Sequence, residues 1–127
     1  MATTANYSSS PRTALVTIST ANTARNGTGT ITSIFSAGAS GSRIDDINIV
    51  AQSTTTAGVV RLFLYNGTTH FLIREILVSA ITPSTTQAVF SSSLMGLGLV
   101  LQSGWALTAS TNNAESFNIC VTRAGDF

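Results

Sequence analysis

Apolar and polar residues alternate along most of this chain in short runs, and breaks rich in glycine, asparagine, serine or proline separate the runs. Val16, Thr17 and Ile18 show this two-residue period, which is typical of a strand with one buried face. No segment shows a capped period of 3.6 residues; even 72–79, with its good helix formers, follows a hairpin turn and is expected to be strand. Strands are predicted at 13–20, 28–35, 42–51, 59–65, 70–81, 87–91, 97–101, 105–110 and 115–122.

Short strands at regular spacing predict one all-β domain, an eight- to nine-stranded antiparallel β-sandwich formed by residues 13–127. Residues 1–12 are polar and lack this pattern. We expect them to form an extended N-terminal arm, with Tyr7, Pro11 and Arg12 as its contact residues. So polar a segment buries little within its own chain, and a neighbouring subunit is expected to hold it.

A hairpin is predicted at Asn66-Gly67, because both residues tolerate the positive φ of a tight turn. A two- or a four-residue loop leaves the same residues on each face. One face is apolar and is expected in the core: Val60, Leu62, Leu64, Phe71 and Ile73. The other carries Arg61, Phe63, Tyr65, His70, Leu72 and Arg74. Aromatics and arginines are enriched at protein interfaces, so this face is a candidate interface; a second core layer with snorkelling arginines explains it equally well.

Isoleucine spacing predicts a β-bulge in the strand at 42–51. Ile44 and Ile47 are three residues apart, whereas Ile47 and Ile49 are two apart. The alternation therefore slips by one near Asp45 and Asp46, as an extra residue in one strand requires.

The paired acids at 45–46 raise the question of a metal. Calcium takes roughly six to eight oxygen ligands, and adjacent strand residues point to opposite faces. We therefore interpret the pair as bulge residues that form salt bridges with Arg43 or Arg25. The sequence also leaves open an arrangement in which Asp45 and Asp126 lie close together in space.

The composition is poor in charge. The chain has no lysine, 37 serines and threonines, 9% charged residues and a net charge of +1. Nucleic-acid binding requires a basic surface that this chain lacks. It also lacks a signal-peptide pattern and an apolar run of roughly 20 residues, so we expect synthesis in the cytoplasm and no membrane partner. Weakly charged surfaces tend to associate, which favours a protein packed against other proteins.

No motif indicates catalysis. His70 is the only histidine, no serine lies in a Gly-x-Ser-x-Gly context, and Glu75 and Glu115 are isolated in sequence. The single cysteine, Cys120, is interpreted as a buried small hydrophobe. We therefore expect no enzyme activity, no cofactor, no metal and no small-molecule substrate.

Six phrases occur along the chain in a recognisable order: TANTARNGTG at 20–29, GSRID at 41–45, TTAGVVRLFLYNG at 55–67, LIRE at 72–75, GWALTAST at 104–111 and AESF at 114–117. In this order they resemble small structural proteins of tailed bacteriophages and prophages, some of which are similar to capsid decoration, or cement, proteins. The resemblance covers nearly the whole chain from about Thr13 and includes no catalytic motif.

The resemblance implies a jelly-roll-like sandwich that forms a homotrimer in the virion. Its partners would be copies of itself and the major capsid protein, whose outer surface it would bind and stabilise. The family offers no site residues to carry over, so the hairpin face and the arm remain the candidate contacts. The alternative is a tail or fibre component with a receptor- or carbohydrate-binding sandwich, for which Trp105, Tyr65 and Tyr7 would be the stacking platforms.

Overall fold

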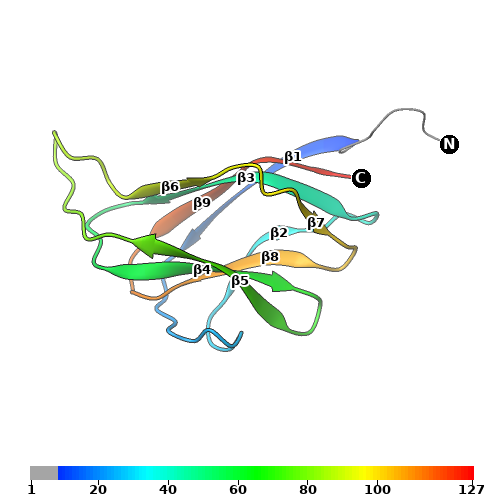
Figure 1. Cartoon of the computed structure of the whole chain (residues 1–127), viewed down its shortest axis with the longest axis horizontal. Coiled ribbons are helices and arrows are strands. Elements are labelled where there is room, and N and C mark those ends of the chain that lie inside the picture. Colours follow the sequence, from blue (N-terminus) through cyan, green and yellow to red (C-terminus); the bar gives the residue numbers. More distant parts are fainter. Residues whose placement is uncertain (1–8) are drawn as a thin grey trace.

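The computed structural model describes residues 9–127, and within this range the chain forms nine β-strands and no helix (Figure 1). The all-β prediction is therefore confirmed. The strands are β1 (Ser10–Ile18), β2 (Thr32–Ser36), β3 (Ser42–Ala51), β4 (Gly58–Tyr65), β5 (His70–Val78), β6 (Ser91–Leu94), β7 (Leu99–Leu101), β8 (Ala106–Thr111) and β9 (Phe117–Asp126).

The strands form two antiparallel sheets, one above the other in Figure 1. The first has the order β1-β9-β3-β6, with β7 paired to another part of β3, and the second has the order β2-β8-β4-β5. The pairing is nested: β1 pairs with β9, β2 with β8, β3 with β6 and β7, and β4 with β5. The first and last strands are therefore neighbours, and the middle of the chain forms a hairpin.

One hydrophobic core lies between the sheets. Ile49 and Ile119 of the first sheet and Phe35, Leu62 and Leu107 of the second are all 2% exposed or less. Burying a side chain of this kind stabilises a fold by about 1.5–3 kcal/mol. Alternation thus decides which face of each strand enters the core.

The predicted bulge in β3 is confirmed. The register against β9 shifts on both sides of Asp46, and Ile44 and Ile47 are both buried. Arg43 Nε donates to Asp45 Oδ1 at 2.9 Å, as one of the predicted alternatives required. The Asp46 carboxylate accepts from the backbone of Gly96 at 3.0 Å, which anchors the β6–β7 connection beside the bulge.

The strand predicted at 87–91 is wrong, because β6 begins only at Ser91. Backbone hydrogen bonds between Ser84 and Gln87, in both directions, make this stretch a tight turn. Phe90 is 7% exposed and contacts Phe117 edge to face. The Phe90 ring therefore fills one end of the core from a loop. Its apolar character is not part of an alternating strand pattern.

Strand β1 begins inside the segment that the sequence assigned to the arm. Ser10, Pro11 and Arg12 pair with Asp126, Gly125 and Ala124 of β9. These arm residues therefore belong to the first sheet. Tyr7, the other predicted contact residue of the arm, lies outside the described residues.

Asp126 joins four strands at one end of the molecule. Its Oδ1 accepts from Arg12 Nη2 at 2.9 Å and from Ser42 Oγ at 2.6 Å. Arg12 also donates to the carbonyl of Ser36 and lies 3.9 Å above the ring of Phe35. The Ser42 hydroxyl and the Arg12 guanidinium hold the pKa of Asp126 below its ordinary value, so the carboxylate is charged at neutral pH and fastens β9 to β1, β2 and β3.

Truncating the core should destabilise the fold strongly. In Leu107→Ala, a 0% exposed side chain leaves a cavity between the sheets, and we expect the free energy of unfolding to fall by about 2–5 kcal/mol. Urea denaturation measures it. Leu77, 80% exposed, supplies the control: Leu77→Ala should change stability by less than about 0.5 kcal/mol. Equal effects of the two substitutions would contradict the assignment of the core.

Candidate interaction surfaces

Five of the six predicted hairpin residues share the outer face of the second sheet. Phe63 pairs with Leu72, Tyr65 pairs with His70, and Arg61 follows the same alternation. The loop between β4 and β5 has four residues, and Asn66 Oδ1 accepts three hydrogen bonds that close it.

Arg74 does not belong to this face, so the prediction for it is wrong. The register shifts by one at Ile73, which makes Arg74 the partner of Leu62. Ile73 and Arg74, the two residues of this bulge, line the open side of the core together with Leu97 and Leu99. Beyond the bulge it is Glu75 that faces Arg61.

The outer face of the second sheet is covered in part by the β1–β2 connection, residues 19–31, which lies beneath the sheet in Figure 1. Asn22 N donates to the carbonyl of Thr111 at 2.8 Å. The side-chain amide of Asn22 donates to the carbonyls of Thr28 and Thr30, each at 2.9 Å. Asn22 thus docks the connection on β8 and also closes its loop.

Arg61 is enclosed under this connection and is 2% exposed. Its guanidinium donates to Glu75 Oε2 at 2.9 Å, to the carbonyl of Asn22 at 3.0 Å and to Asn112 Oδ1 at 3.2 Å. A buried cation requires such partners. Arg25 Nε also donates to Glu75 Oε2, at 2.7 Å, so the connection and the sheet share one carboxylate.

The pKa of Glu75 is lowered, first by the hydrogen bond from Arg25 and then by the one from Arg61, against partial desolvation that raises it. Sequence spacing made Glu75 look isolated, because its two cationic partners lie 50 and 14 residues away. It is the acid that ties the connection to β4 and β5.

The predicted interface is therefore divided. Arg61 and Phe63, 2% and 0% exposed, lie in a second buried layer, as the alternative explanation of this face required, and neither is accessible to a partner. Tyr65, His70 and Leu72 are partly exposed at the hairpin end. These three remain candidate contact residues.

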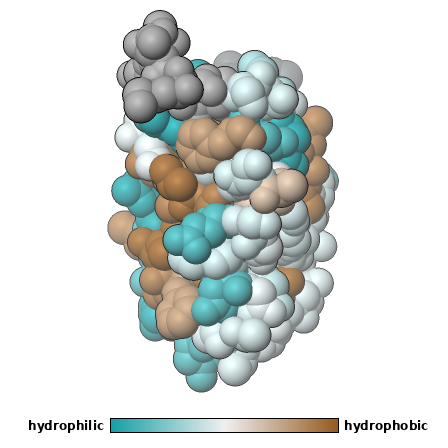
Figure 2. Space-filling model, turned by 90° about the vertical axis from the view of Figure 1, so that its right-hand side faces the viewer, coloured by the Kyte–Doolittle hydropathy of each residue, from teal (hydrophilic) through white to brown (hydrophobic). Residues whose placement is uncertain are grey.

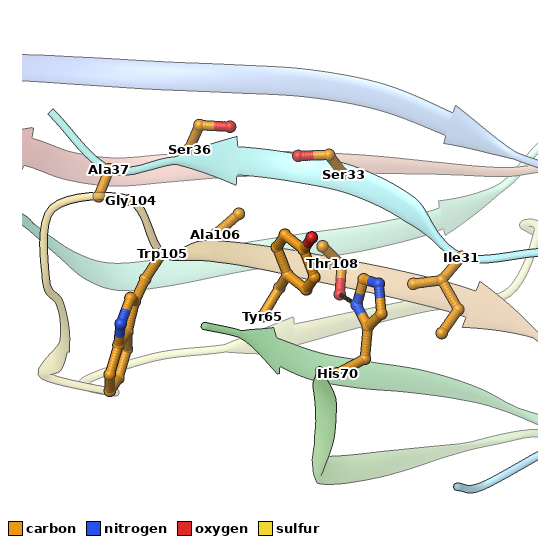
Figure 3. Close-up of a pocket in the computed structure, with 10 residues that line it drawn as sticks. All are labelled: Ile31, Ser33, Ser36, Ala37, Tyr65, His70, Gly104, Trp105, Ala106 and Thr108. Atoms are coloured by element: carbon orange, nitrogen blue, oxygen red, sulfur yellow. Dashed lines mark hydrogen bonds between the residues drawn. The ribbon is translucent and has the colours of Figure 1, made fainter. Parts of the chain in front are cut away.

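A hollow of about 270 Å³ lies beside them on the outer face (Figure 3). Ala106 and Thr108 of β8 lie between Ser33 and Ser36 of β2 on one side and the hairpin residues on the other. The lining residues are Ile31, Ser33, Ser36, Ala37, Tyr65, His70, Gly104, Trp105, Ala106 and Thr108. The hollow thus brings together Tyr65 and Trp105, two of the three predicted stacking residues.

The imidazole of His70 is fixed from two directions. It stacks on Tyr65 with ring centroids 4.3 Å apart, and its Nδ1 lies 3.0 Å from the Thr108 hydroxyl. Desolvation lowers the pKa of His70 below its ordinary 6.5. The ring is therefore neutral at pH 7.

An apolar strip follows the open side of the molecule, between β5 of one sheet and β7 of the other. Phe71 and Ile73 are 54% and 44% exposed, so the prediction that both lie in the core is wrong. Ile73, Leu97 and Leu99 line a cavity of about 190 Å³ that reaches Leu62. Figure 2 shows more hydrophobic surface toward one side of this view and mostly pale surface of intermediate hydropathy toward the other.

The outer face of the first sheet has two adjacent rows of uncharged residues, and its charges lie in the Arg43–Asp45 and Arg123–Asp46 pairs near the β3 bulge. One row across it contains Leu15, Cys120, Asn48 and Ser93, and the next contains Thr17, Asn118, Val50 and Ser91. Leu15 is 78% exposed. Cys120 is half-buried on this face, so its interpretation as a buried core residue is wrong.

Comparison with protein families, with curated proteins and with solved structures finds no match to this chain. Within residues 9–127 no three His, Cys, Asp or Glu residues cluster as metal ligands would. The same residues include no helix of the length and hydrophobicity that crossing a membrane requires. The function therefore has to be inferred from the surfaces described above.

Glu75→Gln should destabilise the fold in a pH-dependent way. The pKa of Glu75 is lower in the folded chain than its ordinary 4.5, so its contribution to stability is complete above that pH and is lost as the pH falls through the folded value. The variant should unfold at lower urea than the wild type at pH 7, and the difference should shrink below about pH 4.5.

Arg123→Gln is the matched control for loss of a charge, since Arg123 is 70% exposed and 3.7 Å from Asp46. Exposed ion pairs contribute little, so its midpoint at pH 7 should stay close to that of the wild type. A Glu75→Gln deficit of the same size at pH 3 and pH 7 would contradict the role given to the carboxylate.

Proposed function

We propose that this chain is a structural subunit of a bacteriophage virion, most specifically a capsid decoration protein that binds and stabilises the outer capsid surface. The observation that carries the proposal is the apolar strip on the open side, where Phe71 and Ile73 are 54% and 44% exposed. A contiguous exposed apolar surface marks an interaction site. The resemblance of the sequence to small phage structural proteins gives that site its biological setting.

The strand pairing supports the jelly-roll part of the proposal. A jelly roll is an eight-stranded, two-sheet sandwich, and it is obtained when a long antiparallel hairpin is wound up so that its nested pairs fall alternately in two sheets. Here β1–β9 and β3–β6 fall in the first sheet, and β2–β8 and β4–β5 in the second. Strand β7 then continues the edge that β6 begins.

The surfaces suggest a division of contacts. Contacts between copies of one chain are more apolar than other interfaces, so we assign the open-side strip to a homotrimer. The uncharged rows on the outer face of the first sheet, with Leu15 exposed on the edge strand β1, are assigned to the major capsid protein. Many modest contacts hold such a subunit firmly when symmetry repeats them.

The proposed role is non-catalytic. His70, the only histidine, contacts the hydroxyl of Thr108 and the rings of Tyr65 and Phe63. Thr108 itself is 2% exposed and donates to the carbonyl of Phe63. This arrangement supports a packing role for the pair and requires no cofactor.

A tail or fibre component is the second candidate, since the same surfaces serve assembly on a tail as well as on a head. The hollow beside Trp105 and Tyr65 favours it, because a receptor-binding protein needs a concave site. Labelling the chain in intact virions and imaging them separates the two locations.

Phe71→Asp should dissociate the homotrimer, because it places a charge in the centre of the apolar strip. Light scattering coupled to size exclusion measures the mass, which should fall from that of three chains to that of one. Leu77→Asp, an 80% exposed position on the other face of β5, should leave the mass unchanged. A wild-type chain that is monomeric at high concentration, or a trimeric Phe71→Asp variant, would rule out this assembly.

Removal of residues 2–8 should weaken attachment to capsids without unfolding the domain. The deletion ends before Ser9, whose backbone bonds to Asp126, and so it spares the pairing of β1 with β9. Co-sedimentation with undecorated capsids measures the affinity, and thermal melting checks the fold. Unchanged affinity with an unchanged melting temperature would remove the arm from the proposal.

A further inference from the structure

We propose that the hollow between the hairpin and Trp105 binds an uncharged carbohydrate ring. Tyr65, His70 and Trp105 line it together with the serines of β2, and Figure 3 shows Tyr65 and His70 side by side, whereas the Trp105 indole points away from them. Aromatic rings offer flat apolar faces for the C–H face of a sugar. Hydroxyl and ring N–H groups offer hydrogen bonds to its hydroxyls.

Small residues make the hollow. Ala106, 7% exposed, lies on the outer face of β8 opposite Tyr65. Ala37 and Gly104 add no bulk near Trp105. Large side chains at these positions would fill the volume, so a small floor beside the aromatic wall of Tyr65 and His70 leaves a concave site open.

The hollow holds polar groups that the fold does not use. Within residues 9–127, the hydroxyls of Ser33 and Ser36 and Nε2 of His70 make no hydrogen bond to the protein. The Thr108 hydroxyl donates to the carbonyl of Phe63 at 3.4 Å. The neutral imidazole of His70 offers one donor and one acceptor nitrogen, and its Nδ1 lies 3.0 Å from the Thr108 hydroxyl. Donors and acceptors are thus both offered, as a sugar requires.

The absence of charge from the lining selects the ligand class. None of the ten lining residues is Asp, Glu, Lys or Arg, and the imidazole of His70 is neutral at pH 7 because desolvation lowers its pKa. Phosphorylated and carboxylated ligands would lose their hydration without meeting a cation among the lining residues. A neutral polyhydroxylated ring loses little hydration energy, because the protein hydroxyls of the hollow replace the water molecules bonded to the sugar.

The size and rigidity of the hollow match a single sugar ring. Its volume of about 270 Å³ lies just below the range of roughly 300–1,000 Å³ for drug-sized ligands. Tyr65 is held by its stacking on His70 and by the bond from its hydroxyl to the carbonyl of Gly67 at 2.9 Å. A fixed platform reduces the entropic cost of binding.

Titration of the full chain with neutral sugars, followed by amide NMR, tests the proposal. The probes are glucose, galactose, mannose and N-acetylglucosamine with their trisaccharides, and glucuronic acid is the charged comparator. We expect at least one neutral probe to bind with a dissociation constant on the order of 1 mM. Its shifts should cluster at the β8 and hairpin residues of the hollow. Glucuronic acid should bind more weakly than glucose.

Variants assign the binding to the hollow. Tyr65→Ala should weaken it at least tenfold, and Ser36→Ala, an exposed change that leaves the packing intact, about threefold. Phe71→Ala, on the apolar strip, is the matched aromatic control and should bind as the wild type does. No shifts with any probe at 50 mM, shifts away from the hollow, tighter binding of glucuronic acid, or an affinity indifferent to Ser36→Ala would each overturn the proposal.

Discussion

A buried guanidinium organises one half of this molecule. Arg61 lies in the middle of a central strand and is 2% exposed, so every N–H that it turns away from water requires an acceptor. Glu75, the carbonyl of Asn22 and the side chain of Asn112 supply them. These acceptors come from three separate parts of the chain, and the demand of one side chain thereby fixes the β1–β2 connection on the sheet.

The connection in turn decides which surface is left for partners. Where it lies over Arg61, the outer face of the second sheet becomes interior. Beyond it, the face opens again as the hollow at Tyr65 and Trp105. The few charges of the chain are thus largely paired within the fold, as Arg12 is with Asp126 and Arg61 is with Glu75. The remaining surface is hydroxyl-rich or apolar, which suits close packing against protein or sugar.

Local pattern was sufficient for much of the fold. Alternation placed β3 at 42–51 with its bulge, and Asn66-Gly67 placed the hairpin. The failures have a common cause, which is that the deciding contact is remote in sequence. The bulge at Ile73 has no turn residue to announce it, so Arg74 was assigned to the wrong face. The burial of Arg61 depends on a connection some 40 residues away, and Phe90 closes the core from a loop.

The nested pairing of strands has a consequence for how the chain acquires its structure. Ser10 pairs with Asp126, so the first strand to leave the ribosome has to wait for the last before its hydrogen bonds are satisfied. Pairings at such separation carry a high loop-closure entropy and slow the search for the native state. The β4–β5 hairpin is the local exception and is suited to form first, with the outer pairs added around it. Until β9 is complete, β1 and β3 remain open edges, and folding after release competes with association between chains.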